Sequence, residues 1–293
     1  MSKVAVLLST YNGEKYLKEL LDSVFAQKGV EVSVIVRDDG SSDGTVAILK
    51  QYGKQHSLYL IQGDNIGYKK SFWSLLKEAS RIGADYYAFA DQDDIWLPQK
   101  LKTCLETISS ISGPALCTGT VIPIDANGNR LKGDPFPIHG PLSLPESLQR
   151  SILPGCTFVF NEEARRICSM YNGYIESHDW AMYAIVTALG TVIYSEAAGV
   201  LYRLHGENTI GAPSRISELR QKVSRFVSGN ARVRSRFAMD MLITYHDYLK
   251  QNDLQIIALM ANANKSLSTR MELASASMFH GLIFKTYALL GRI

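Results

Sequence analysis

Short apolar runs alternate with amphipathic segments along the first part of the chain. Lys3 to Leu8 and Val30 to Val36 are rich in Val, Ile and Leu, as expected of strands buried on both faces of a parallel sheet. Between them, Glu14 to Gln27 places its apolar residues on one helical stripe, which completes a strand, helix, strand unit. The pattern then repeats, with helices predicted at 43–54 and 68–81 and strands at 58–62 and 86–90.

The alternation continues after Pro98 and then gives way to helix. Helices are predicted from Pro98 to about Ser110 and at 178–189, and strands at 115–124, 155–160 and 191–194. The stretch from Gly133 to Pro145 holds four prolines, which predicts a loop. Beyond Pro213 the pattern is purely helical. We therefore predict an α/β domain at 1–211, with a Rossmann-like, mostly parallel sheet flanked by helices, and a helical C-terminal region at 212–293.

The net charge of +3, from 31 Lys and Arg against 28 Asp and Glu, is too small to indicate nucleic-acid binding. Its distribution is uneven, because residues 212–293 hold 12 basic and 5 acidic residues, or +7, which leaves −4 for the first 211. From Arg215 to Arg236, basic residues alternate with apolar ones at helical spacing, which predicts a basic amphipathic helix. This helix would contact an anionic membrane surface, or pack on the α/β domain or on a second subunit of a homodimer.

The four cysteines are 13, 39 and 12 residues apart, without the paired short spacing of a zinc or redox motif, so we expect reduced core residues. The N-terminal apolar run is too short for a signal peptide, and no stretch approaches the length of a membrane span. The expected compartment is the cytoplasm, including the inner face of the cell membrane.

Polar motifs follow three of the predicted strands, where ligands bind in open parallel sheets. They are STYN at 9–12, DDGSSDGT at 38–45 and DQDD at 91–94. Three acids within four residues at a buried strand end repel one another and lose hydration, and a bound Mg²⁺ or Mn²⁺ offsets that cost. Such a metal completes its shell with phosphate oxygens, which implies a nucleotide diphosphate. The alternative is that Asp94 caps the next helix and the other acids are solvated.

Asp39 closes the second strand, where its carboxylate can accept the imide N–H of a uracil or thymine ring. The alternative is an Asx-turn, and we expect both, with Asp43 capping the following helix. Neither GxGxxG nor GxxxxGK[ST] occurs in the chain. We therefore expect the metal, and not a glycine-rich loop, to neutralise the diphosphate.

Together, STYN, DDGSSDGT and ADQDDIW resemble the inverting family-two glycosyltransferases, with the glycosyltransferase A-type fold, over roughly the first 210 residues. The segments NIGYKKSFWSLL, PGCTFVFN, SHDW and YRLHGENTIG are similar to bacterial rhamnosyltransferases that build surface polysaccharides. This resemblance implies transfer of rhamnose from dTDP-rhamnose, or of another hexose from a UDP-sugar, to a glycan or lipid-linked glycan acceptor.

The resemblance also implies roles for individual residues. The implied donor nucleotide-binding residues are Thr10, Tyr11, Asp39, Asn65, Gly67 and Asp91. The implied metal ligands are Asp93, Asp94 and His205, although family members differ over which acid of the cluster coordinates. Further candidates for contact with the diphosphate or the acceptor are Arg203, Trp180 and His178. A structural role is the alternative for Arg203, Trp180 and His205.

Inverting transfer needs a carboxylate that takes the proton of the acceptor hydroxyl. Asp179, in SHDW at the start of a predicted helix, matches the base of the family, and a helix N-terminus tends to keep it ionised. Its alternative role is the N-cap of that helix. A sugar nucleotidylyltransferase is a second reading, but STYNGEKYLKELL lacks the glycine-rich basic segment that a triphosphate requires. A non-catalytic nucleotide-sugar binding module is the third reading.

Overall fold

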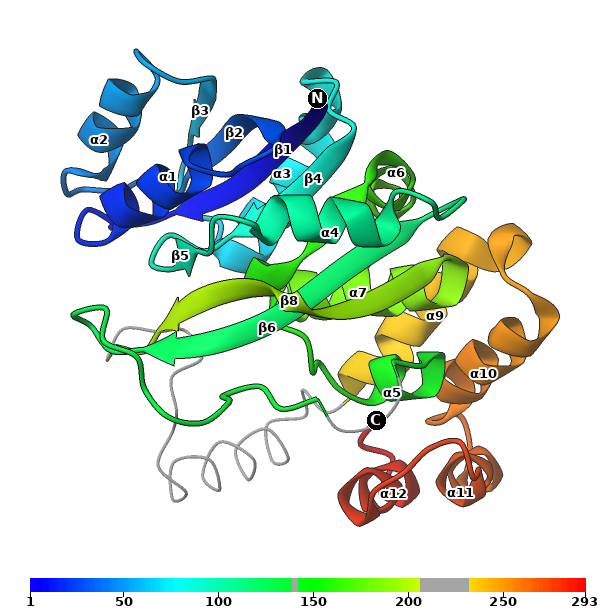
Figure 1. The fold of residues 1–293 in the computed structure, drawn as a ribbon. Helices are drawn as coiled ribbons and strands as arrows, with labels where there is room; N and C mark the ends of the chain where they lie inside the picture. Colours follow the sequence, from blue (N-terminus) through cyan, green and yellow to red (C-terminus); the bar gives the residue numbers. More distant parts are fainter. Residues whose placement is uncertain (139–141, 206–231) are drawn as a thin grey trace.

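A single eight-stranded sheet forms the centre of the molecule (Figure 1). The computed structural model describes residues 1–138, 142–205 and 232–293. The strand order is β3-β2-β1-β4-β7-β6-β8-β5. The first four strands pair in parallel, as predicted, and are β1 (Ser2–Thr10), β2 (Val30–Asp38), β3 (Leu58–Gln62) and β4 (Tyr86–Ala90).

The second half of the sheet mixes directions. β7 (Val159–Asn161) is antiparallel to both β4 and β6 (Ala115–Ile124), while β8 (Thr191–Arg203) runs parallel to β6. The short edge strand β5 (Ile95–Trp96) pairs antiparallel with β8. β8 extends nine residues past the predicted end at Tyr194, which brings its C-terminal end to the edge of the sheet where β4 ends.

Alternate residues of β1 enter two different hydrophobic cores, one on each face of the sheet. Val4 and Val6 pack toward α1 (Leu17–Phe25), α2 (Thr45–Tyr52) and α4 (Lys100–Ile108). Ala5 and Leu7 pack toward α3 (Tyr68–Glu78), α6 (Glu162–Ser169) and α7 (His178–Leu189). This two-sided burial explains the continuous apolar runs of the strands and confirms the predicted α/β architecture.

Two short helices lie where the sequence predicted loop or made no prediction, and one predicted strand is replaced in part by a turn. The proline-containing stretch ends in α5 (Leu144–Gln149), with Pro145 in its first turn, where the missing N–H costs nothing. α6 begins directly after β7, because the Asn161 side chain accepts a hydrogen bond from the Ala164 N–H at 2.9 Å. The strand predicted at 155–160 is instead a 3₁₀ turn (Gly155–Thr157) followed by β7.

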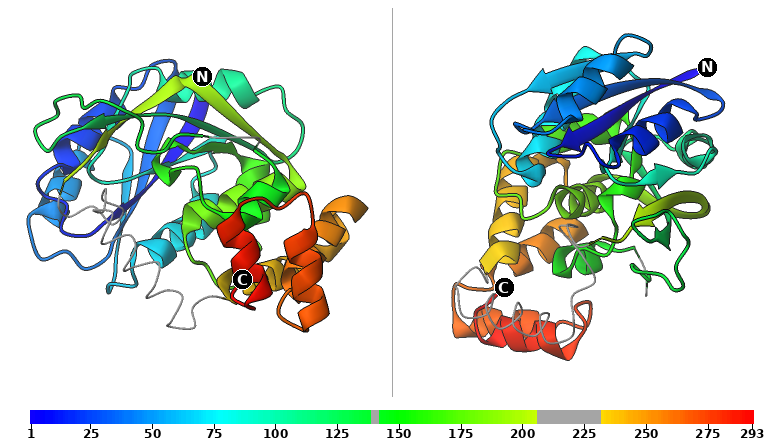
Figure 2. Two further views of the ribbon diagram at one scale, coloured as in Figure 1. Left: turned by 90° about the horizontal axis from the view of Figure 1, so that it is seen from below. Right: turned by 90° about the vertical axis from the view of Figure 1, so that its left-hand side faces the viewer.

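Helices α9 (Val233–Tyr245) and α10 (Gln251–Asn262) share the core of the α/β domain. Phe237 lies 4.7 Å from Trp180 between ring centres, and the Tyr245 hydroxyl donates to the Ile167 carbonyl at 2.9 Å. α11 (Leu267–Ser275) and α12 (Leu282–Leu289) lie farther out, at the margin of the molecule in every view (Figures 1 and 2). The predicted boundary at 211/212 and most of the predicted basic helix at 215–236 lie outside the described residues.

All four cysteines are buried and free of disulfide bonds, as predicted. Across the described residues, none of the helices combines the length and the apolar composition that crossing a membrane requires.

Candidate active site

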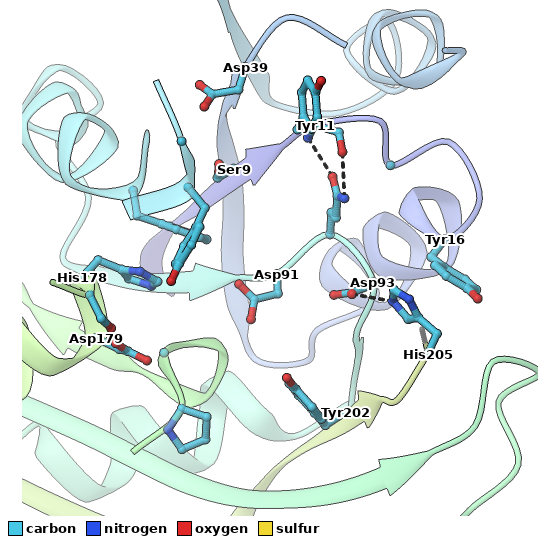
Figure 3. Close-up of a pocket in the computed structure, with 18 of the residues that line it drawn as sticks. Ser9, Tyr11, Tyr16, Asp39, Asp91, Asp93, His178, Asp179, Tyr202 and His205 are labelled. Carbon is cyan, nitrogen blue, oxygen red and sulfur yellow. Dashed lines mark hydrogen bonds and ion pairs between the residues drawn. The ribbon is translucent and has the colours of Figure 1, made fainter. Parts of the chain in front are cut away.

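A cavity of about 690 Å³ opens beyond the carboxyl ends of β1, β2 and β4 (Figure 3). Its volume is within the range of about 300–1,000 Å³ that is usual for small-molecule sites. The structure brings nine of the predicted site residues to its wall: Tyr11, Asp39, Asn65, Gly67, Asp91, Asp93, His178, Asp179 and His205. The other four are Thr10, Asp94, Trp180 and Arg203, which do not line the cavity.

Asp39 holds the loop after β3 against the end of β2. Its buried carboxylate forms an ion pair with Arg37 and accepts a hydrogen bond from the Ile66 N–H at 3.2 Å. The next residue, Gly67, has a φ of +80°, which only glycine adopts readily, and α3 starts directly after it. Thr10 is 1% exposed and its hydroxyl donates to Asp38 at 3.0 Å. The side chain of Thr10 therefore joins two strand ends beneath the cavity, and the contact of Thr10 with a base stays a prediction.

Gln92 joins the loop after β1 to the loop after β4. Its side-chain oxygen accepts from the Tyr11 N–H at 2.9 Å, and its amide nitrogen donates to the Tyr11 carbonyl at 3.1 Å (Figure 3). Asn12 makes a similar link, since its side-chain oxygen accepts from the Ser42 N–H at 2.9 Å. Sequence reasoning missed both residues. Asn12 could have been found from its position in the STYN motif, and Gln92 from its position in the DQDD motif.

Three carboxylates follow one another across the cavity. Asp91 lies between Asp179 on one side and Asp93 on the other (Figure 3). Burial, and then the negative charges of Asp93 and Asp179, raise the pKa of Asp91 above its ordinary value. Asp93 is paired with His205, whose Nε2 is 2.8 Å from the Asp93 Oδ2. The centre of the cavity therefore carries negative charge that a cationic group would stabilise.

Asp94 does not line the cavity, although its carboxylate lies close to that of Asp91. It is fully buried and accepts a hydrogen bond from the Arg203 N–H at 3.2 Å, and burial raises its pKa well above the ordinary value. Its carboxylate belongs to a buried cluster with Asp91 and Cys156, whose potential ligand atoms lie within 4.8 Å of one another. Of the three predicted metal ligands, Asp93 and His205 therefore line the cavity, whereas Asp94 is buried beneath it.

Arg203 ties three segments together beneath the cavity. Its guanidinium, 1% exposed, donates to the Asp93 carbonyl at 2.9 Å and to the Ala126 carbonyl at 3.1 Å. It also pairs with Glu19 of α1 at 2.7 Å. These contacts position the loop that carries Asp93. These contacts favour the structural alternative for Arg203, and its contact with a diphosphate stays a prediction.

The N-terminus of α7 brings Asp179 to the cavity. The Asp179 carboxylate accepts from the Trp180 N–H at 2.7 Å, and burial raises its pKa to about 6. His178 stacks on Phe72, with 4.1 Å between ring centres, and burial lowers the pKa of its imidazole to about 3, so the ring is neutral. Trp180 points into the core, where its N–H donates to the Ser147 carbonyl at 2.6 Å. Trp180 therefore has the structural role that was its alternative in the sequence analysis, and its indole does not face the cavity.

Residues 5–167, more than half of the chain, match the family described as glycosyl transferase family 2. The chain belongs to this family. Among the relatives of this glycosyltransferase is the dTDP-rhamnosyl transferase RfbG of Shigella flexneri, 28% identical over 70% of this chain and 74% of the relative. The putative teichuronic acid biosynthesis glycosyltransferase TuaG of Bacillus subtilis (strain 168) is 31% identical over 55% of this chain and 62% of the relative.

The fold of the glycosyltransferase also matches a solved structure. The crystal structure of S. aureus TarS residues 1–349 in complex with UDP-GlcNAc superposes with a TM-score of 0.60 at 17% identity. The match covers 99% of this chain and 88% of that one. The family and the fold class predicted from the sequence are both confirmed.

Two side chains at the cavity are of a type that binds divalent cations. Asp91 and Asp93 present carboxylate oxygens, the donors that Mg²⁺ and Mn²⁺ prefer, and burial, followed by the negative charges of Asp93 and Asp179, raises the pKa of Asp91. His205 adds a ring nitrogen beside Asp93. Lys100 is the cation beneath the cluster, but it donates to the Cys156 carbonyl at 2.7 Å and its charge lies below the cavity wall.

Gly155 leaves the space that His178 and Asp179 occupy. A Cβ at this position would lie 2.7 Å from the His178 Nε2 and 3.1 Å from the Asp179 Cβ. We expect Gly155→Ala to lower kcat for sugar transfer by about tenfold to a hundredfold, because it would displace Asp179, the predicted base. Steady-state kinetics would measure this. Gly53→Ala is the matched control, since its Cβ would meet nothing closer than 3.5 Å, and equal kcat losses in both variants would contradict the prediction.

Proposed function

We propose that this glycosyltransferase moves rhamnose from dTDP-rhamnose to a growing cell-surface polysaccharide, with inversion at the anomeric carbon. The observation that carries the proposal is the placement of Asp179 across one cavity from Asp91 and Asp93. The likeness to RfbG supports rhamnose, and the likeness to TuaG supports a surface polymer as the product. Another hexose from a UDP-sugar is the alternative donor. The acceptor is a glycan, which we propose to be lipid-linked.

In the proposed reaction, the donor diphosphate lies on the side of Asp91 and Asp93. These two carboxylates, with His205 beside Asp93, would hold a Mn²⁺ or Mg²⁺ ion, which neutralises the diphosphate when bound. Asp39 and Tyr11 border the end of the cavity where we place the base and, with Asn65 and Gly67, the nucleoside.

Asp179 then acts on the acceptor. Its carboxylate takes the proton of the acceptor hydroxyl as that oxygen bonds to the anomeric carbon, and the bond to the diphosphate breaks on the opposite face. A base in this position must be ionised before it can act. Burial works against ionisation, while hydrogen bonds from the backbone at Trp180 and Gly155 favour it.

The raised pKa of Asp179 predicts an acid limit for the reaction. Since only the ionised carboxylate accepts a proton, we expect kcat to fall about tenfold per pH unit below pH 6. Initial rates between pH 4.5 and pH 8, with donor and acceptor saturating, would show this limb. A kcat that stays constant down to pH 4.5 would contradict the role of Asp179.

The function itself is tested with radiolabelled nucleotide sugars, both dTDP- and UDP-linked, with Mn²⁺ and with a chelator as control. The expected result is transfer that is fastest from dTDP-rhamnose and that the chelator abolishes. Thermal-shift measurements with the same panel report donor binding without an acceptor. If the protein binds the donor but transfers sugar to none of the acceptors tried, the result would favour the non-catalytic alternative. Release of pyrophosphate from a sugar phosphate and a nucleoside triphosphate would favour a nucleotidylyltransferase.

A further inference from the structure

Helix α12 carries a row of aliphatic side chains on its outer surface. Leu282 and Ile283 are 83% and 67% exposed, and Leu289 and Leu290 are 46% and 52% exposed. Their spacing of i, i+1, i+7 and i+8 places all four on one face of the helix. The opposite face packs inward through Ala288, which is buried. We call these four residues the α12 face.

The neighbouring helix α11 adds to this apolar surface. Leu267 is 65% exposed and Met271 is 56% exposed, and the two helices pack against each other. The large apolar side chains that are exposed within 267–290 are Leu267, Met271, Met278, Leu282, Ile283, Leu289 and Leu290. Seven such side chains within 24 residues exceed the scattered single exposures that are ordinary on a soluble protein. They therefore indicate a contact surface.

Basic residues outnumber acidic ones in and around this segment. From residue 265 to residue 293 the basic residues are Lys265, Arg270, Lys285 and Arg292. The only acidic residue in this stretch of the sequence is Glu272. An apolar face in a segment with four basic residues and one acidic residue complements a surface that is apolar inside and anionic at its boundary.

We propose that the α12 face docks on the surface of an anionic lipid bilayer. At eight residues, α12 is too short to span a bilayer and suits a position in the plane of the headgroups. Helices α11 and α12 lie at one edge of the molecule (Figure 2), where a flat membrane surface can reach them. This docking goes beyond the proposed transfer reaction and does not depend on which sugar the enzyme uses.

The test is flotation of the full chain with lipid vesicles. At low salt, the wild-type protein is expected to float with phosphatidylcholine vesicles that contain phosphatidylglycerol, and not with phosphatidylcholine alone or at high salt. The double variant Leu282→Ser, Ile283→Ser is expected to reduce the bound fraction about tenfold or more, because two side chains no longer enter the apolar layer. Ile243→Ser is the matched control, since Ile243 is 76% exposed on α9, outside the α12 face.

Three results would overturn the proposal. The first is that the wild type fails to float at low salt. The second is that the double variant floats as well as the wild type. The third is that Ile243→Ser reduces flotation as much as the double variant does. Analytical ultracentrifugation decides between a bilayer and a second copy, because a dimer that the double variant abolishes would make the α12 face a protein interface. Transfer to a water-soluble acceptor, measured in parallel, keeps a failure of docking distinct from a failure of the proposed function.

Discussion

Replacing Asp179 by Asn is expected to lower kcat for sugar transfer by about a hundredfold to ten-thousandfold, the usual contribution of a general base. The amide has nearly the shape of the carboxylate but cannot take the acceptor proton. The donor dissociation constant is expected to change little, since Asp179 lies on the other side of Asp91 from Asp93. Single-turnover kinetics with labelled donor, together with calorimetric titration of the nucleotide diphosphate, would separate the two quantities.

A control for this variant lies three residues earlier. Glu176 accepts a hydrogen bond from the Tyr174 hydroxyl at 2.7 Å and does not line the cavity, so Glu176→Gln removes a nearby carboxylate without touching the site. We expect this control to keep nearly full turnover. Full turnover of Asp179→Asn would require another base, and we would then withdraw the role of Asp179.

Replacing Asp93 by Ala is expected to weaken the binding of dTDP or UDP in the presence of Mn²⁺ by about a hundredfold or more. The change removes a carboxylate that faces the cavity and the partner of His205 at once. In the wild type, a chelator should weaken nucleotide binding to a similar extent. Calorimetric titrations with and without Mn²⁺ give both comparisons.

Asp85→Ala is the matched control for this measurement. The Asp85 carboxylate accepts a hydrogen bond from the Lys3 N–H at 2.8 Å and does not line the cavity. Nucleotide binding by this variant should retain the wild-type response to Mn²⁺. If the wild type itself gave the same weak heats with and without Mn²⁺, the cation would have no part in donor binding.

The sequence predicted the first four strands and α7 closely because a local run of apolar residues marks each of them. The second half of β8 escaped prediction. Its residues from Ser195 to Gly199 are polar or small, and the pairing with β6, which is distant in the sequence, shifts register within this stretch. Local pattern carries no information about such pairing.

The candidate site was predicted in outline because the ends of parallel strands meet at one edge. The sequence did not reveal which acidic residues of the DQDD motif face the cavity. In the structure Asp91 and Asp93, two residues apart, line the cavity, whereas Asp94 is buried against the Arg203 backbone. The burial of Arg203 likewise depends on Glu19 and Ala126, which only the folded chain brings near it.

The two hydrogen bonds between the Gln92 side chain and the Tyr11 backbone connect the loop after β1 with the loop after β4. Any displacement of Tyr11 by an incoming nucleoside is transmitted to the residue that stands between Asp91 and Asp93. In the proposed function, the nucleoside at Tyr11 and the cation at Asp91 and Asp93 are therefore connected through Gln92. We expect the affinity for the nucleotide to depend on whether the cation is bound.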